Sequence, residues 1–196
     1  MRYLVITGFA LMVAAQWYAP LSMIWDAQKN VEEGVEYKFK TAPVDPTDPF
    51  RGKYITLNFD AETYHPMDTS EASLPERTEV YALLTRDSSG YATIFQLTDN
   101  RPPAGLDYIT TEIYYVYRDY DNNRPVISLN FPFTRYYLEE SKASEAEKLY
   151  WTTNRDTTEV CYAKVSVHEG NSTLTDVMIG DKRIVDIVRE LNATEN

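Results

Sequence analysis

The sequence predicts a mainly β protein, in which a single N-terminal transmembrane helix is followed by a β-sandwich or partly closed barrel domain with one or two short helices. Three observations predict this fold. Residues 3–25 form a run of 23 residues without a charged side chain. About eight short segments then alternate apolar and polar residues, as half-buried strands do. Helix signals appear after this only as a capping box before residue 148 and as apolar residues at helical spacing from residue 184.

The composition permits one packed domain. The chain has 196 residues, 43% of them hydrophobic, and a net charge of -11. This length allows one domain plus a membrane segment, and the apolar share excludes a disordered chain. The acidic balance argues against a nucleic acid partner, because phosphate binding needs basic side chains. With Cys161 as the single cysteine, an intrachain disulfide is excluded, and no Cys/His cluster has zinc-site spacing.

The uncharged run is long enough to cross a bilayer. As a helix it spans about 34 Å, and Tyr3 and Trp25 place aromatic rings at its two ends. A cleaved signal peptide is the alternative, since Arg2 precedes the run and residues 13–15 are small enough for a cleavage site. Gln16 lies near the middle, where its amide is either tolerated in a lone anchor or bonded to a neighbouring helix. We expect an anchor (1–25), a linker or short helical extension (26–34) and a β domain (35–196).

The remaining elements follow in chain order. Alternation predicts strands at 35–40 and 54–59, and turn residues predict hairpins at 79–97 and 108–133. A further strand pair is expected at 159–168 and 172–179. A capping box of Ser144 and Glu147 predicts a short helix that includes residues 148–151. A second helix is predicted by apolar residues at helical spacing, namely Ile184, Ile187, Val188 and Leu191.

A stiff loop precedes the second strand, because residues 42–54 contain three prolines. Asp45 and Asp48 in this loop have the residue type of an acid/base pair or a cation site. The structural alternative, which we favour, is that they cap backbone amides and neutralise Arg51. We therefore expect Asp45 or Asp48 to pair with Arg51 or Arg135, which would tie the loop to a later segment.

The loop and strand resemble the signature of a bacterial family. Residues 45–59 are similar to the motif of the GDYXXLXY family, membrane-anchored proteins with no established activity. Gly52, Tyr54 and Leu57 match the motif, whereas Lys53 stands in place of Asp and Phe59 in place of the last Tyr. The resemblance continues at residues 126–133 and 135–139. It implies a bacterial inner-membrane protein with a cytoplasmic N-terminus and a periplasmic domain, and it implies no activity.

Other patterns point to chemistry less strongly. A Ser/Lys hydrolase like the signal peptidases is disfavoured, because Ser22 lies inside the apolar run and the candidate lysines fall on exposed strand or loop positions. Asp119, Asp121 and Asn123 have the opening spacing of a calcium loop. The glycine and the closing glutamate of such a loop are absent, which favours a hairpin turn.

From the sequence we expect a non-enzymatic accessory subunit without cofactor or metal. Its partners would be integral membrane proteins, contacted through residues 3–25, with Gln16 as the docking residue, and through the β domain. The expected motif and interaction residues are Asp45, Asp48, Arg51, Gly52, Lys53, Tyr54, Leu57, Arg135, Tyr136, Tyr137 and Glu139.

The alternative is a module that binds an envelope glycan, a lipid or a small ligand. It would use the Arg51/Arg135 pair and a face of clustered tyrosines. Because Tyr114 and Tyr115 are adjacent in one predicted strand, at least one of them is expected to point out of the core.

Overall fold

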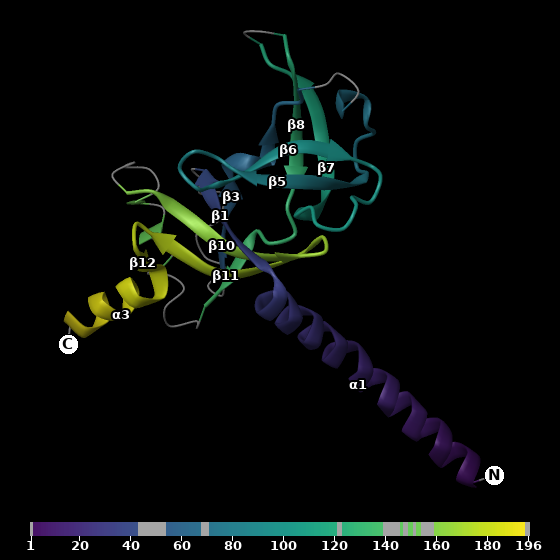
Figure 1. The fold of residues 1–196 in the computed structure, drawn as a ribbon. Coiled ribbons are helices and arrows are strands. Elements are labelled where there is room, and N and C mark those ends of the chain that lie inside the picture. Colours follow the sequence, from purple (N-terminus) through teal and green to yellow (C-terminus); the bar gives the residue numbers. More distant parts are fainter. Residues whose placement is uncertain are drawn as a thin grey trace.

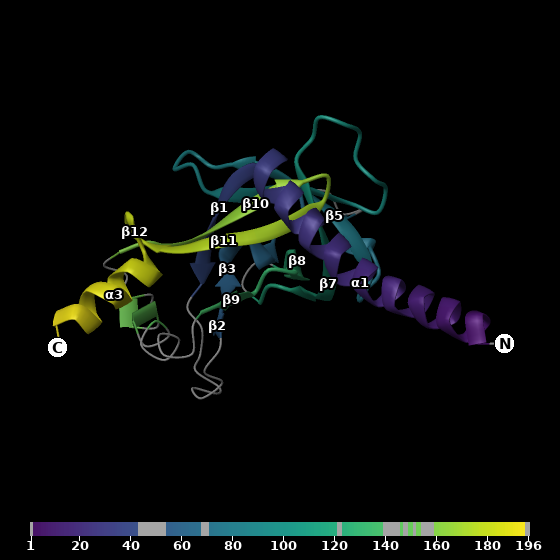
Figure 2. The ribbon, with the colours of Figure 1, turned by 90° about the horizontal axis from the view of Figure 1, so that it is seen from below.

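The structure is a computed structural model that describes residues 2–42, 54–67, 71–120, 123–138, 146, 149–150, 152–153 and 159–194, except the side chains of residues 2, 4, 5, 10, 19, 26, 192 and 194. One long helix, α1 (Arg2–Glu33), leads into a mainly β domain, and a shorter helix, α3 (Ile184–Thr194), ends the described chain. The two helices leave the domain at opposite ends of the β10–β11 hairpin (Figure 1 and Figure 2).

The described strands form two five-stranded sheets and one two-stranded sheet, and their pairings are antiparallel. The first sheet has the order β12 (Lys182–Arg183), β11 (Asn171–Ile179), β10 (Cys161–His168), β1 (Val35–Ala42), β3 (Asn58–Phe59). The second has the order β4 (Thr63–Tyr64), β8 (Pro125–Asn130), β7 (Tyr108–Arg118), β5 (Glu79–Arg86), β6 (Ala92–Thr98). β2 (Tyr54–Thr56) pairs with β9 (Arg135–Tyr137). Two short 3-10 helices, η1 (Asp60–Glu62) and η2 (Glu71–Ser73), lie between strands.

The two large sheets enclose one hydrophobic core, and together they form a half-barrel. The turn between β10 and β11 helps to join them, because the Thr110 N–H on β7 donates to the Gly170 carbonyl oxygen at 2.8 Å. Gly170 has a φ of +89°, and a Cβ there would lie 2.6 Å from the Tyr108 ring. Only glycine allows this approach without displacing the ring. The mainly β prediction is thus confirmed.

Most predicted strands are present within a few residues of their expected bounds. The hairpin predicted at 79–97 is β5 and β6, and the one predicted at 108–133 is β7 and β8, with β8 ending at Asn130. The strand predicted at 54–59 is divided, since β2 pairs with β9 whereas β3 pairs with β1. Between them the Leu57 N–H donates to the Thr134 carbonyl oxygen at 2.8 Å. One predicted strand therefore connects two sheets.

Both predicted short helices have helical residues. α3 begins at Ile184, and Ile184 and Val188 are fully buried. Around the other predicted helix, Ala146 and Tyr150 are helical and buried, whereas Ser144 and Glu147 lie outside the described residues.

The polar segment after the apolar run continues α1 without a break to Glu33. Its last turn is fixed to the domain through Asn30, which is 6% exposed. The Asn30 side chain donates to Thr173 at 3.3 Å, and its carbonyl oxygen accepts from the Ser166 hydroxyl and the Gly34 N–H. Of the two alternatives for this segment, the structure has the helical extension.

In the part of the chain that the structure describes, no helix is both long enough and apolar enough to cross a membrane. The transmembrane assignment of residues 1–25 is not supported by that finding and stays a prediction.

Candidate functional site

The signature strand divides its side chains between the core and the surface. Ile55, Leu57 and Phe59 are buried, whereas Tyr54 is half-buried and Thr56 is exposed. This alternation is what an extended backbone imposes on successive side chains. The family motif therefore combines residues that build the core with residues that face solvent.

The buried half of the signature packs into a group of phenylalanines. The rings of Phe39, Phe59, Phe131 and Phe133 contact one another, with centroids 5.1 Å to 6.0 Å apart. Phe59 is the position at which the motif has Tyr. Because its ring is buried among other phenylalanines, the missing hydroxyl leaves no unpaired polar group in the core.

The outward-facing side chains of the signature strand contact residues 135–137, which belong to the later segment that resembles the family. Tyr54 lies opposite Tyr137 in the β2–β9 pair, and their ring centroids are 5.6 Å apart. The Arg135 guanidinium carbon lies 5.1 Å from the centroid of the Tyr54 ring. Tyr137 is 66% exposed. Tyr54, Arg135 and Tyr137 thus form one stacked surface group built from two distant parts of the chain.

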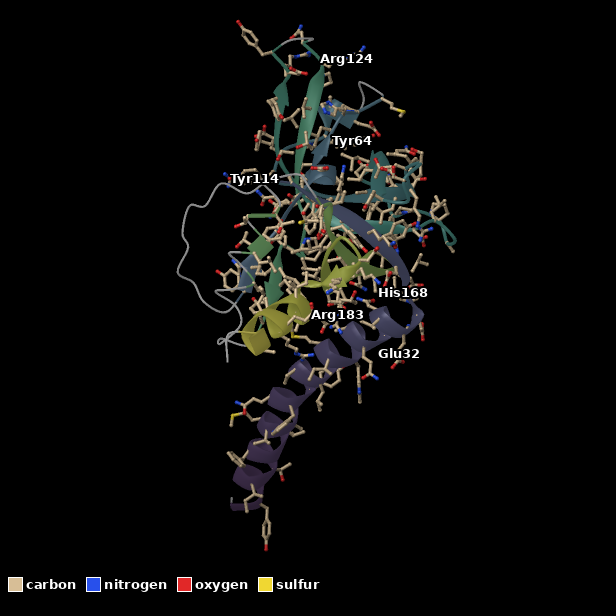
Figure 3. The ribbon with its side chains drawn as sticks, turned by 90° about the vertical axis from the view of Figure 1, so that its left-hand side faces the viewer. Glu32, Tyr64, Tyr114, Arg124, His168 and Arg183 are labelled. Carbon is tan, nitrogen blue, oxygen red and sulfur yellow. The ribbon has the colours of Figure 1, made fainter. Side chains whose placement is uncertain are left out.

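Tyr136 points the opposite way, into the domain. Its hydroxyl donates to the Asp176 carboxylate at 3.2 Å, and the Arg183 Nε donates to the same oxygen at 3.0 Å. Burial, together with the charge and hydrogen bond of Asp176, raises the pKa of Tyr136 to about 12, and Arg183 opposes this rise. Asp176 lies in β11, and Arg183 lies in β12 just before α3 (Figure 3). These hydrogen bonds therefore connect β9 to β11 and β12.

The rest of the predicted motif set lies outside the described residues. These positions are Asp45, Asp48, Arg51, Gly52, Lys53 and Glu139. The expected pairing of Asp45 or Asp48 with Arg51 or Arg135 therefore stays a prediction. In the described residues, strand pairing and ring stacking connect the signature strand to the later segment.

Sequence reasoning missed two carboxylates that bond inside the domain. The Glu62 carboxylate accepts the Phe59 N–H at 2.9 Å, and it also bonds to the backbone of Phe131. Burial raises the pKa of Glu62 to about 7, although these backbone bonds lower it. Glu62 follows Phe59 by three residues, the spacing of a local capping bond, and this spacing is the signal that could have found it.

Glu71 is the second of these carboxylates, and it is 8% exposed. It accepts the Tyr64 hydroxyl at 2.9 Å and the Leu97 N–H at 3.0 Å. Burial and this hydrogen bond raise the pKa of Tyr64 well above its usual value. Leu97 lies 26 residues after Glu71 in the chain, so no local sequence pattern predicts the hydrogen bond between them.

The tyrosine prediction for β7 is confirmed, since Tyr114 and Tyr115 are both exposed. A β-bulge between Ile113 and Tyr115 shifts the alternation, so that Tyr115 and Tyr117 share the outer face. Their ring centroids are 5.4 Å apart, and those of Tyr114 and Tyr115 are 5.3 Å apart. The ring contacts of Tyr114, Tyr115 and Tyr117 do not include the stacked surface group of Tyr54, Arg135 and Tyr137.

The turn after β7 is closed by backbone hydrogen bonds. The Asp119 N–H donates to the Arg124 carbonyl oxygen, and the Asn123 N–H donates to the Asp119 carbonyl oxygen, both at 2.9 Å. This bonding agrees with the hairpin interpretation of the calcium-like spacing, although Asp121 is not described. Among the described residues, no group of three or more His, Cys, Asp or Glu side chains could hold a metal ion.

These features define a class of protein: a half-barrel domain on a long N-terminal helix, with a signature strand paired to a later Arg-Tyr-Tyr segment. The chain belongs to the GDYXXLXY family, since the family model described as "GDYXXLXY protein" matches residues 16–177. The match begins at Gln16 within α1 and ends in β11, so it includes most of the half-barrel. Searches of curated proteins and of solved structures gave no match.

Proposed function

We propose that this protein is a non-enzymatic accessory subunit of a larger assembly in the bacterial inner membrane. In this proposal α1 is a single-pass anchor that docks on an integral membrane partner, and the β domain stands in the periplasm. The observation that carries the proposal is the surface of α1, which presents large apolar side chains to its surroundings on every side.

The exposed side chains of α1 are those that a water-soluble helix normally buries. Its exposed large hydrophobic residues are Tyr3, Ile6, Phe9, Leu11, Met12, Trp17, Tyr18, Leu21, Met23, Ile24, Trp25 and Val31. A surface helix of a soluble domain has one apolar stripe and one polar face. The whole run of residues 3–25 is uncharged in the sequence, and about 20 such residues suffice to cross the apolar part of a bilayer. This sequence property supports the anchor.

The docking part of the proposal depends on Gln16. Its side chain is exposed on α1, so the described part of the domain supplies no partner that shields it from a lipid environment. An amide within the apolar region gains from a hydrogen bond to a neighbouring helix, worth about 1 kcal/mol. A partner helix would also cover Trp17 and Tyr18, which are exposed beside it.

The fixed junction between α1 and the domain also supports an accessory role. Asn30 is buried against β10 and β11, and His168 Nε2 lies 3.6 Å from the Glu33 carboxylate. Figure 3 shows His168 beside the end of α1. A domain held in this way would face a docked partner in one orientation. The family resemblance supports the periplasmic side for the domain.

The test is affinity purification of the full-length protein in mild detergent, followed by size-exclusion chromatography and mass spectrometry. We expect one multi-pass membrane protein to co-elute in a fixed ratio. Gln16→Leu should reduce its recovery about fivefold, corresponding to the loss of one interhelical hydrogen bond. Met12→Leu is the matched control, because it changes an exposed residue of the same helix while keeping its apolar character. A full-length protein that elutes alone would refute the accessory role.

A further inference from the structure

The outer half of β7 carries a compact group of aromatic side chains that the core does not use. Tyr114, Tyr115 and Tyr117 are 58%, 43% and 42% exposed. We call these three residues the tyrosine strip. β5 pairs with β7 only from Tyr108 to Glu112, so the strip lies on the part of β7 that extends beyond that pairing.

The rings of the strip are arranged as neighbours along the strand. The Tyr115 and Tyr117 rings are tilted by 33° with centroids 5.4 Å apart, and the Tyr114 ring stands edge-on to Tyr115. The β-bulge at Tyr114 produces this arrangement, since a regular strand would turn Tyr114 and Tyr115 to opposite faces. Three neighbouring tyrosine rings are therefore exposed together along the outer part of the strand.

The chemistry of the strip is amphipathic. Every exposed large hydrophobic side chain in the described part of the β7–β8 hairpin is a tyrosine. Glu76 accepts the Val116 N–H at 2.9 Å, and Arg118 donates to the Asn123 carbonyl oxygen at 3.0 Å, so one acidic and one basic side chain lie beside the strip. The strip thus presents aromatic rings and hydroxyl groups, and among the described residues of the hairpin no large aliphatic side chain is exposed beside it.

We infer that the tyrosine strip binds an extended, uncharged glycan. The C–H faces of pyranose rings are apolar and pack on aromatic faces, while their hydroxyl groups hydrogen-bond to tyrosine hydroxyls. A bilayer would require exposed aliphatic side chains, and an anionic polymer would be repelled by the net charge of -11 of the chain. Linked sugar rings match a row of neighbouring aromatic rings better than either.

The position of the strip agrees with a ligand on the side away from α1. The β7–β8 hairpin projects from the domain on the side opposite the N-terminus (Figure 1). Figure 3 places Arg124, at the end of this hairpin, and Glu32, near the end of α1, at opposite ends of the domain. If α1 is the anchor proposed above, the hairpin points from the membrane towards the envelope glycans.

The experiment measures binding of a linear hexamer of N-acetylglucosamine to the full-length protein in detergent by isothermal titration calorimetry. We expect the double variant Tyr115→Ala/Tyr117→Ala to weaken binding about tenfold or more, because it removes two of the three exposed rings. The matched control is Phe95→Ala, which removes an aromatic ring of similar exposure (38%) from β6 and should leave the affinity unchanged. The Tyr115→Phe/Tyr117→Phe variant retains the aromatic rings and should retain most of the affinity.

Several outcomes would overturn the inference. One is that the hexamer does not bind, and another is that the alanine and control variants bind it equally. A third is that the alanine variant loses the co-purifying membrane protein while the hexamer does not bind, which would make the strip a protein contact. Failure of the membrane partner experiment alone leaves the glycan result intact, so the two proposals are separable. A thermal melt of each variant verifies that it is folded.

Discussion

The carboxyl group of Glu62 is expected to make the stability of the domain depend on pH near neutrality. Burial raises its pKa from 4.5 to about 7, against the opposing effect of the backbone bonds to Phe59 and Phe131. At about 1.4 kcal/mol for each pH unit, this difference corresponds to about 3 kcal/mol. The folded state holds the Glu62 proton more tightly than the unfolded chain does. The destabilisation is therefore absent below about pH 4.5, grows as the pH rises, and is complete above about pH 7.

The assay is urea unfolding of the full-length protein in mild detergent, followed by circular dichroism at pH 5 and pH 8. Most of the pH-dependent difference falls between these two values, so the free energy of unfolding should drop by about 2 kcal/mol more in the wild type than in Glu62→Gln. Glutamine keeps an oxygen that can accept the Phe59 N–H, and it does not titrate. Glu79→Gln, on the exposed side of β5, is the control and should behave like the wild type. If Glu62→Gln and the wild type lose the same stability between pH 5 and pH 8, the reasoning is refuted.

The same unfolding assay tests two further substitutions. Gly34→Ala should destabilise the domain by about 1–3 kcal/mol, because its Cβ would lie 2.2 Å from the Asn30 carbonyl oxygen, whereas Gly8→Ala should have little effect on the domain since nothing lies within 4 Å. An unchanged unfolding midpoint for Gly34→Ala would mean that α1 is not held against the sheet as described. Leu57→Ala should cost about 2–5 kcal/mol because the side chain is fully buried, whereas Thr56→Ala, one residue away and exposed, should stay within about 0.5 kcal/mol. Equal effects at these two positions would contradict the division of the signature into buried and exposed halves.

The alternation of side chains in the strands was predictable from the sequence because it depends only on local geometry. Tyr37 and Phe39 in β1, and Ile55, Leu57 and Phe59 in the signature strand, are buried as their period of two predicts. The division of that strand between β2 and β3 was not predictable, because it depends on Arg135–Tyr137 arriving beside β2 from far along the chain. Pairing partners are a tertiary property that periodicity does not contain.

The candidate sites show the same limit. The exposure of at least one of Tyr114 and Tyr115 followed from strand geometry, but the bulge that exposes both depends on the register of β7 against β8. Asn30 was treated as part of a polar extension, yet it is buried, because Thr173 and Ser166 satisfy its amide and carbonyl groups from a distance of more than 130 residues in sequence. A polar residue is buried only where such partners exist, and a single sequence does not show them.

Because α1 leads directly into β1, the number of helical residues before the junction determines in which direction the domain faces around the helix axis. Since α1 is continuous to Glu33 and its last turn is held to the sheet through Asn30, each residue of helix before the junction advances the domain by about 1.5 Å and turns it by about 100°. A chain that gained one residue in this stretch would present a different side of its half-barrel to whatever surrounds α1. Only insertions close to a whole number of helical turns would restore the original orientation. The number of residues between the apolar run and the first strand therefore determines the orientation of the domain, whatever their amino-acid composition.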